Sequence, residues 1–216
     1  MKQIETIQTG KNYAAVNVGK IDEIIEHELP MGPDFTLHGK VFVGQAVGAT
    51  GSELSFQTLV PGQDSGFLHT HKTHEELYII LRGQGHYQVD GEIFPVSEGS
   101  VVRVSPDGKR ALKNTGSELS FQTLVPGQDS GFLHTHKTHE ELYIILRGQG
   151  TYQVDGEQFP VSEGTIVRVS PDGRRALKNT GAEPLTMLCI QYKANAFTEA
   201  DSPMTDGNIL SDPLNW

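Results

Sequence analysis

The chain contains one stretch of 65 residues twice in direct succession. Residues 51–115 and 116–180 align without a gap and differ at only five positions. Solenoid repeats run from about 20 to 50 residues and usually number three or more. Two long copies instead indicate one segment of a smaller parent protein, duplicated in tandem. Any fold of this chain must therefore use the same sequence in two places.

Each copy has the hydrophobic pattern of short β-strands. The run "SELSFQTLV" alternates between apolar and polar residues, and "EELYIILRG" is rich in Leu, Ile and Tyr. Asp90-Gly91 separates two strand-like runs, which predicts a hairpin because a type I′ turn needs positive φ at both central residues. We expect six or seven strands per copy. With 24 Gly and 11 Pro, the chain suits a turn-rich all-β protein.

The segments that flank the repeat differ from it in kind. Residues 20–29 place isoleucines and Leu29 on one helical face, which predicts a short N-terminal helix. Residues 40–47 and 183–193 have strand character, whereas the C-terminal residues form no regular pattern. We therefore expect an N-terminal arm (1–39), a first unit (40–115), a second unit (116–193) and a C-terminal tail (194–216).

Two histidines and one glutamate form the main candidate site of each copy. His69 and His71 point to the same side of a strand, since side chains alternate. After a short turn, Glu76 can face them from the neighbouring strand. Two imidazoles and one carboxylate are the ligands of a facial metal site that leaves positions open for water or substrate. The second copy repeats these candidate ligands as His134, His136 and Glu141.

The spacing of these residues resembles the first motif of the cupin superfamily. It consists of His69-x-His71, four residues, Glu76, six residues and Gly83, and it recurs in the second copy. The resemblance covers residues 40–192. It implies cupin-type antiparallel jelly-roll barrels, internally duplicated and often dimeric, with a ligand pocket inside. It also implies a divalent metal as cofactor, and such ligands suit Zn, Mn, Fe and Ni about equally.

The second cupin motif is incomplete in both copies. The position of the family's last metal-binding histidine holds Arg110 in one copy and Arg175 in the other. A guanidinium has no lone pair to donate and repels a cation. Three arrangements stay open: an arginine turned outward, one turned inward to bind an anionic substrate, or one turned inward to pair with the glutamate and abolish the metal site.

Other polar residues near the motif are secondary candidates. Tyr78 and Tyr143 share a face with the glutamates, so they are candidates for contacting a substrate, with a core position as the alternative. His74 and His139 lie in the turn between the ligand strands. Each can supply a fourth nitrogen ligand or be an exposed loop residue.

The duplication leaves two barrels short of strands. The segment 118–125 can close a first barrel, yet a second barrel needs it to begin. An unpaired sheet edge is costly when buried and invites association when exposed. We expect a shared strand or an exchange with another chain that yields a homodimer. A looped-out copy is the least favoured alternative, because it exposes a large apolar surface.

The net charge and the cysteine content limit the classes of partner and site that we expect. The net charge is −10 without a compensating basic run, so we expect no nucleic acid and no anionic membrane as partner. No apolar run approaches the ~18 residues that cross a bilayer, and we expect a cytoplasmic protein. Cys189, the single cysteine, is expected to be a buried apolar residue.

The sequence supports two classes of function. The first is a metal-binding cupin barrel that binds a small, anionic molecule, either as an enzyme or as a binding protein. The alternative is a metal-free small-molecule-binding barrel, or a duplicated or engineered scaffold, without enzymatic activity. A fold by itself does not decide between them, and the sequence leaves catalysis open.

Overall fold

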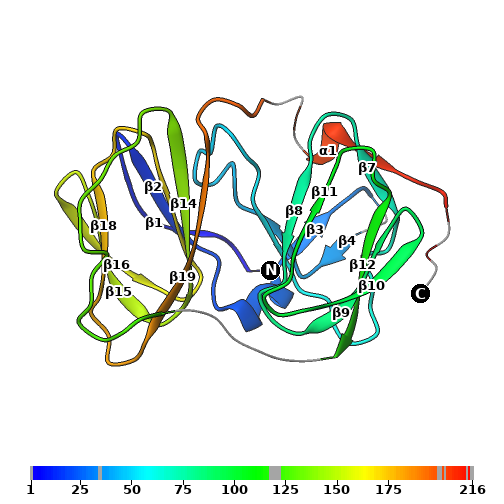
Figure 1. Cartoon of the computed structure of the whole chain (residues 1–216), viewed down its shortest axis with the longest axis horizontal. Helices are drawn as coiled ribbons and strands as arrows, with labels where there is room; N and C mark the ends of the chain where they lie inside the picture. Colours follow the sequence, from blue (N-terminus) through cyan, green and yellow to red (C-terminus); the bar gives the residue numbers. More distant parts are fainter. Residues whose placement is uncertain are drawn as a thin grey trace. The chain divides into compact units, whose positions relative to one another are not determined.

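The structure is a computed structural model with two compact units, each assembled from two stretches of the chain. It describes residues 2–33, 36–116, 123–198, 201, 203–212 and 214. Unit 1 comprises Met1–Thr58 and Gln122–Phe197, and unit 2 comprises Leu59–Phe121 and Thr198–Trp216. Strands dominate both units (Figure 1). The predicted all-β class is confirmed.

Unit 1 contains a six-stranded and a three-stranded antiparallel sheet. The larger sheet has the order β1-β2-β17-β14-β19-β13, and the smaller has the order β16-β15-β18. Two further strand pairs, β3 with β4 and β5 with β6, belong to the N-terminal part. The strands of unit 1 are β1 (Glu5–Gly10), β2 (Tyr13–Asn17), β3 (Glu28–Pro30), β4 (Thr36–His38), β5 (Lys40–Phe42), β6 (Ser55–Gln57), β13 (Thr123–Leu124), β14 (His139–Arg147), β15 (Gln149–Val154), β16 (Glu157–Ser162), β17 (Thr165–Val169), β18 (Arg175–Asn179) and β19 (Leu185–Lys193).

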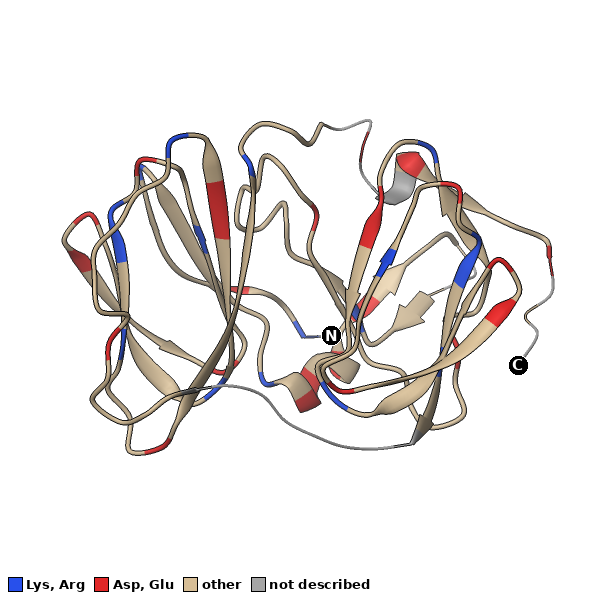
Figure 2. Ribbon diagram, in the orientation of Figure 1, with Lys and Arg blue, Asp and Glu red and all other residues tan. Residues whose placement is uncertain are grey.

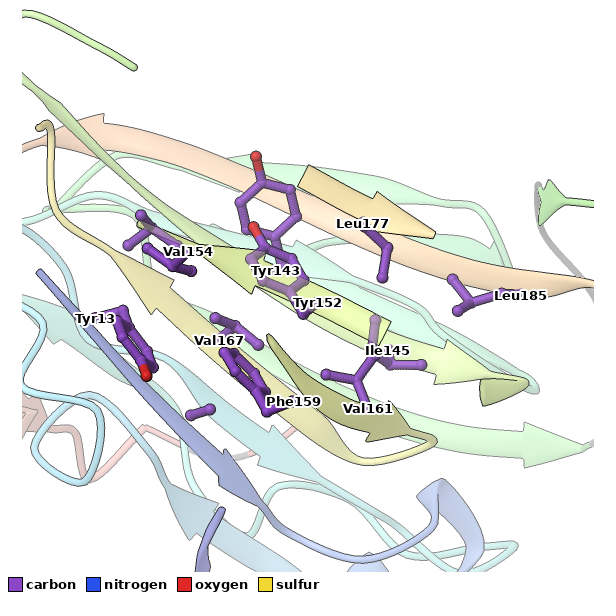
Figure 3. Close-up of a cluster of buried hydrophobic side chains, with 12 residues drawn as sticks. Tyr13, Tyr143, Ile145, Tyr152, Val154, Phe159, Val161, Val167, Leu177 and Leu185 are labelled. Carbon is purple, nitrogen blue, oxygen red and sulfur yellow. The ribbon is translucent and has the colours of Figure 1, made fainter. Parts of the chain in front are cut away.

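The core of unit 1 lies between these two sheets. Tyr143 of β14 and Val167 of β17 belong to the same buried cluster as Tyr152 and Phe159 of the smaller sheet (Figure 3). Full burial of one such side chain contributes about 1.5–3 kcal/mol. The alternation of the strands therefore directs one face of each sheet inward.

Unit 2 has fewer strands. Its sheets have the orders β10-β9-β12-β7-β20 and β11-β8. Its buried cluster consists of Tyr87, Val96 and Val104. The elements of unit 2 are β7 (His69–His71), β8 (Glu76–Ile79), β9 (Gln84–Val89), β10 (Glu92–Ser97), β11 (Val101–Val104), β12 (Arg110–Gly116), α1 (Pro203–Asp206) and β20 (Gly207–Ile209).

The shortage of strands falls on unit 2. Strand β14 has nine residues and lies between β17 and β19, whereas its counterpart β8 has four residues. Within the described residues, β8 pairs with β11 alone. Most of the segment 118–125 lies outside the described residues, and its residues Thr123 and Leu124 form β13 beside β19. Most of the first copy, residues 59–115, nevertheless belongs to the compact unit 2 and is not looped out.

The predicted Asp-Gly hairpins are present in both copies. Asp90 and Gly91 have φ of 52° and 89°, and Glu92 pairs with Val89 across the turn. In the second copy, Asp155 and its following glycine adopt the same conformation. The pair Asp-Gly is suited to this turn because both of its residues tolerate positive φ.

The N-terminal helix and the tail differ from expectation. The helix is a 3-10 helix, η1 (Ile21–Glu26), and it ends because His27 is extended with its ring 2.8 Å from the carbonyl oxygen of Val18. Leu29 therefore lies in β3 and not in the helix. The C-terminal tail is not wholly irregular, since β20 pairs with β7. This part of the tail forms a strand because the described residues of the repeat leave one edge of β7 without a partner.

Candidate functional site

The structure gathers the histidines and glutamates into two clusters. We call His69, His71 and Glu76 the first triad, and His134, His136 and Glu141 the second triad. In each, one possible ligand atom per residue lies within 4.8 Å of the other two. The first triad lies in unit 2 and the second in unit 1. Their role as metal ligands stays a prediction.

The first triad is built by two short strands. His69 and His71 project from β7, and Glu76 begins β8. The distance from His69 Nε2 to Glu76 Oε2 is 3.4 Å, and that from His71 Nε2 to Glu76 Oε1 is 3.3 Å. The preceding Glu75 pairs with Arg103 at the surface. Strand alternation thus places Glu76, and not Glu75, beside the imidazoles.

The second triad has the same arrangement. His134 Nε2 lies 3.5 Å from Glu141 Oε2, and His136 Nε2 lies 3.1 Å from Glu141 Oε1. The preceding Glu140 forms a buried ion pair with Arg168. Acidic stretches are visible on both β8 and β14 (Figure 2). Arg168 therefore neutralises a neighbouring carboxylate and is not part of the triad.

Both motif arginines point inward and are fully buried. Arg110 Nε donates to Glu76 Oε2 at 2.9 Å, and Nη1 donates to the carbonyl oxygens of Pro106 and Gly108 at 2.9 and 2.8 Å. The outward arrangement of the arginine is wrong, because the Pro-Asp-Gly turn supplies carbonyl oxygens that match the guanidinium donors.

The second arginine binds its glutamate through two nitrogens. Arg175 Nε and Nη2 lie 2.9 and 2.7 Å from Glu141 Oε2. The hydroxyl of Tyr143 donates to the same oxygen at 2.6 Å. Since three donors converge on Oε2, the other carboxylate oxygen is the one directed at His136.

The tyrosines of the motif hold the glutamates in place. Tyr78 donates its hydroxyl proton to Glu76 Oε2 at 2.5 Å, as Tyr143 does to Glu141. Burial and the adjacent carboxylate raise the pKa of both phenols. The tyrosines therefore remain neutral donors, and their contact with a substrate stays a prediction.

Both triad carboxylates are ionised at neutral pH. Burial raises the pKa of Glu76, yet hydrogen bonds from His69, His71 and Tyr78 outweigh it and hold the pKa well below its usual range. For Glu141, burial opposes hydrogen bonds from Tyr143 and Arg175, and the pKa falls to about 2. Hydrogen bonds to the charged form explain both directions.

The donor set fits a divalent metal. Each triad offers two imidazole nitrogens and one ionised carboxylate oxygen, and Zn, Mn, Fe and Ni accept such ligands. Pairing of the arginine with Oε2 does not displace the Oε1 atom, which still faces His71 or His136. A nearby guanidinium repels a cation. Each arginine therefore lowers the metal affinity of its triad without occupying the position of the ion.

Three further residues lie near the triads. The sequence indicated no role for two of them, and for the third it predicted a burial that differs from the structure. Asp206 Oδ2 lies 3.0 Å from His71 Nδ1, and Gln191 Nε2 lies 3.0 Å from His136 Nε2. Both occur outside the repeat, so no internal comparison could indicate them. Cys189 is exposed, opposite Tyr143 in β14. Its predicted burial is wrong, because β19 presents this residue on the side of the second triad.

The turn histidines do not join the triads. His74 Nδ1 contacts the hydroxyl of Thr73 at 2.8 Å, and His139 Nδ1 lies 3.0 Å from that of Thr138. Neither belongs to the metal-ligand clusters of the described residues.

The cupin domain profile matches residues 55–121 and 120–191 of this chain. The two segments contain one triad each and together cover more than half of the sequence. The chain therefore belongs to the cupin family and carries two cupin segments in tandem.

Sequence relatives and a solved structure agree with this family. The chain is 33% identical over 97 residues to the uncharacterized protein MJ1618 of Methanocaldococcus jannaschii, covering 44% of this chain and 74% of that protein. It is 29% identical over 93 residues to the oxalate-binding protein of Thermotoga maritima, covering 43% and 76%. The crystal structure of protein Ylba from E. coli aligns with a TM-score of 0.60 at 16% identity, covering 90% and 96%. This last likeness concerns the fold.

The helices that the structure describes include none with the length and hydropathy of a membrane span. The cytoplasmic location expected from the sequence stays a prediction.

Proposed function

We propose that this protein is a divalent-metal-binding cupin in which each triad holds one ion and a small anionic molecule binds beside it. The main observation behind this proposal is that one ligand atom from each of two imidazoles and one carboxylate lies within 4.8 Å of the other two in both copies. Their glutamates are oriented by a tyrosine and an arginine, so the ligand atoms are positioned before an ion binds. Such preorganisation reduces the cost of binding.

The charge balance favours an anionic ligand. Each glutamate is offset by its buried arginine, so a divalent ion adds positive charge that the triad does not neutralise. When bound, the ion supplies a Lewis-acidic centre for the oxygen atoms of a ligand. The name of the oxalate-binding relative from Thermotoga maritima makes small dicarboxylates the first class to test.

The arginines and tyrosines are the proposed contacts to that ligand. Arg110 Nη2 is buried and has no hydrogen-bond partner among the described residues. A guanidinium nitrogen in this state can donate to a carboxylate. The matching group of Arg175 already donates to Glu141, so the proposed anion contact is stronger in the first copy.

Metal analysis of the full-length protein tests the proposal. After chelation, the protein is offered Mn, Fe, Ni or Zn and its bound metal is measured. About two equivalents are expected, one for each triad. His69→Ala and His134→Ala should each remove one equivalent, and the double variant both. His38→Ala is the control, since this histidine is 63% exposed and pairs with Glu28.

Absence of bound metal in the wild-type protein contradicts the proposal. The arginines would then serve as the permanent counter-charges of the glutamates, and the metal-free small-molecule barrel would be the better interpretation. Calorimetry with oxalate, before and after metal loading, separates the two: a metal-binding site requires the ion for oxalate affinity, and a metal-free site does not.

We also propose that the protein is a homodimer through the open edge of unit 2. Strand β14 is paired on both edges, whereas β8 is paired on one edge among the described residues. An open edge is a template for another strand. We assign it to β8 of a second copy in a two-fold arrangement. Exchange of β19 between chains is the alternative outcome of the test.

A further inference from the structure

We propose that the two triads, although identical in sequence, are unequal metal sites, and that the first is the tighter because Asp206 orients His71. This inference rests on the proposed metal-binding function. It concerns a positioning residue that lies outside the repeat, in the C-terminal tail.

Asp206 is held firmly behind the first triad. Its side chain is 2% exposed, and its Oδ2 atom lies 3.0 Å from His71 Nδ1. The other oxygen, Oδ1, accepts hydrogen bonds from the backbone N–H and the hydroxyl of Thr73 at 3.1 and 2.9 Å. Strand β20 follows directly and pairs with β7, with Gly207 opposite His71. Thr73 and the start of β20 therefore hold the carboxylate within ion-pair distance of His71.

This position favours a proton on Nδ1 of His71. A carboxylate beside Nδ1 favours the tautomer with the proton on Nδ1. Nε2 lies on the triad side, 3.3 Å from Glu76 Oε1; when a metal ion takes Nε2 as its ligand, the ring proton lies on Nδ1 and is available to Asp206. Carboxylates that orient metal-binding histidines in this way typically raise metal affinity by about 10–100-fold.

The second triad has a different neighbour. Gln191 Nε2 lies 3.0 Å from His136 Nε2 and 3.5 Å from Glu141 Oε1. An amide NH2 group is a donor, and its nitrogen also lies 3.3 Å from His136 Nδ1, so it competes with a metal ion for the ring nitrogens and for Glu141 Oε1. Among the described residues, Glu141 is the acidic group that pairs with His136.

The segments around the two triads thus make them different, although the triad segments themselves have the same sequence. The tail and β19 occur once each, so only one triad receives Asp206 and only the other receives Gln191. Arg175 also contacts its glutamate with two nitrogens, whereas Arg110 uses one. All three differences weaken the second site relative to the first.

Calorimetric titration of Zn²⁺ into two single-triad variants tests the inequality. His134→Ala retains the first triad, and His69→Ala retains the second. We expect at least about tenfold tighter binding in His134→Ala. Equal affinities, or tighter binding in His69→Ala, overturn the inference while leaving the proposed function intact. If neither variant nor the wild-type protein binds Zn²⁺, and the wild-type protein also takes up no Mn, Fe or Ni, the proposed function fails as well.

Asp206→Asn tests the positioning role directly. The backbone N–H of Thr73 requires an acceptor, so the amide oxygen should replace Oδ1 and the NH2 group should face His71 Nδ1. This arrangement removes the proton from Nδ1 and leaves one on Nε2, the nitrogen that has to bind the metal ion. In the His134→Ala background we expect an affinity loss of about 10–100-fold; in the His69→Ala background we expect none.

Nitrogen NMR of the imidazoles separates positioning from a structural effect. We expect His71 to lose the proton from Nδ1 and to keep the one on Nε2 in Asp206→Asn. Slow exchange of the Leu210 amide, which donates to the carbonyl of Leu68 at 2.8 Å, reports that the tail stays bound. An affinity loss without loss of the Nδ1 proton overturns the inference. Asp212→Asn is the matched control, since Asp212 pairs with Lys109.

Discussion

Leu77 and Leu142 occupy the same position of the repeat, yet the first is 57% exposed and the second is 1% exposed. Each lies in the strand that carries the glutamate of its triad. Leu142 belongs to a strand with partners on both edges, whereas Leu77 belongs to β8 at an open edge. The surroundings, and not the local sequence, decide whether this leucine stabilises the protein.

Alanine substitution should therefore have unequal effects at these two positions. Leu142→Ala removes a fully buried side chain and should lower the free energy of unfolding by about 2–5 kcal/mol. Leu77→Ala removes an exposed one and should change it by less than about 0.5 kcal/mol. Chemical denaturation followed by circular dichroism measures both. Equal losses would show that Leu77 is covered in solution.

The proposed dimer predicts an effect of charge at the open edge. Leu77→Lys places an ammonium group on β8, and such charges on edge strands oppose pairing. We expect the dimer to dissociate to monomers in sedimentation velocity. A dimer that persists in this variant favours exchange of β19, and a wild-type monomer at all concentrations contradicts the proposed dimer.

Arg110→His should strengthen the first metal site. Arg110 Nε lies 2.9 Å from Glu76 Oε2, so an imidazole at this position can reach the triad. The change removes a positive charge beside the ion and adds a nitrogen donor, and we expect metal affinity to rise by about tenfold or more.

Without metal, the same variant should be less stable than the wild-type protein. Arg110 is fully buried but the Glu76 side chain is 33% exposed, so the loss should be smaller than the roughly 3–5 kcal/mol of a fully buried ion pair. Zn²⁺ should restore this loss, as seen by denaturation with and without the ion. Arg103→His, at an exposed arginine paired with Glu75, should change neither quantity. Unchanged affinity in Arg110→His would place the residue outside the metal site.

The depressed pKa of Glu141 predicts an acid-dependent stability. Its value of about 2 in the folded protein lies below the ordinary value of 4.5. A group with a lowered folded pKa contributes stability that is present above pH 4.5 and is lost as the pH falls toward 2. The contribution is about 3 kcal/mol.

Comparison of denaturation at pH 6 and pH 3 checks this contribution. Glu141→Gln should be less stable than the wild-type protein at pH 6, and the gap should narrow at pH 3. Glu157→Gln, at an exposed glutamate of β16, serves as the control. A gap of constant size would mean that ionisation of Glu141 does not stabilise unit 1.

Gln191→Ala should improve the second metal site. The amide NH2 of Gln191 lies 3.0 Å from His136 Nε2, and its removal frees that nitrogen for an ion. In the His69→Ala background we expect Zn²⁺ affinity to rise several-fold in calorimetry. A fall in affinity would indicate that Gln191 supports the site.

The sequence by itself was sufficient for the local features. Alternation in a strand places His69 and His71 on one side, and the spacing to Glu76 sets it beside them. The Asp90-Gly91 turn follows from two residues that tolerate positive φ. These features depend on a few consecutive residues, so the same sequence produces them in both copies.

Only the tertiary structure decided what surrounds each copy. The inward position of Arg110 depends on turn carbonyls and on Glu76 across the sheet, and the sequence left three arrangements open. Asp206 and Gln191 reach the triads from segments that occur once. How deeply a residue is buried, and which further residues contact it, depends on the neighbouring strands. The two copies cannot both pair with the single β19 or the single β20. This competition for unique segments makes the copies different.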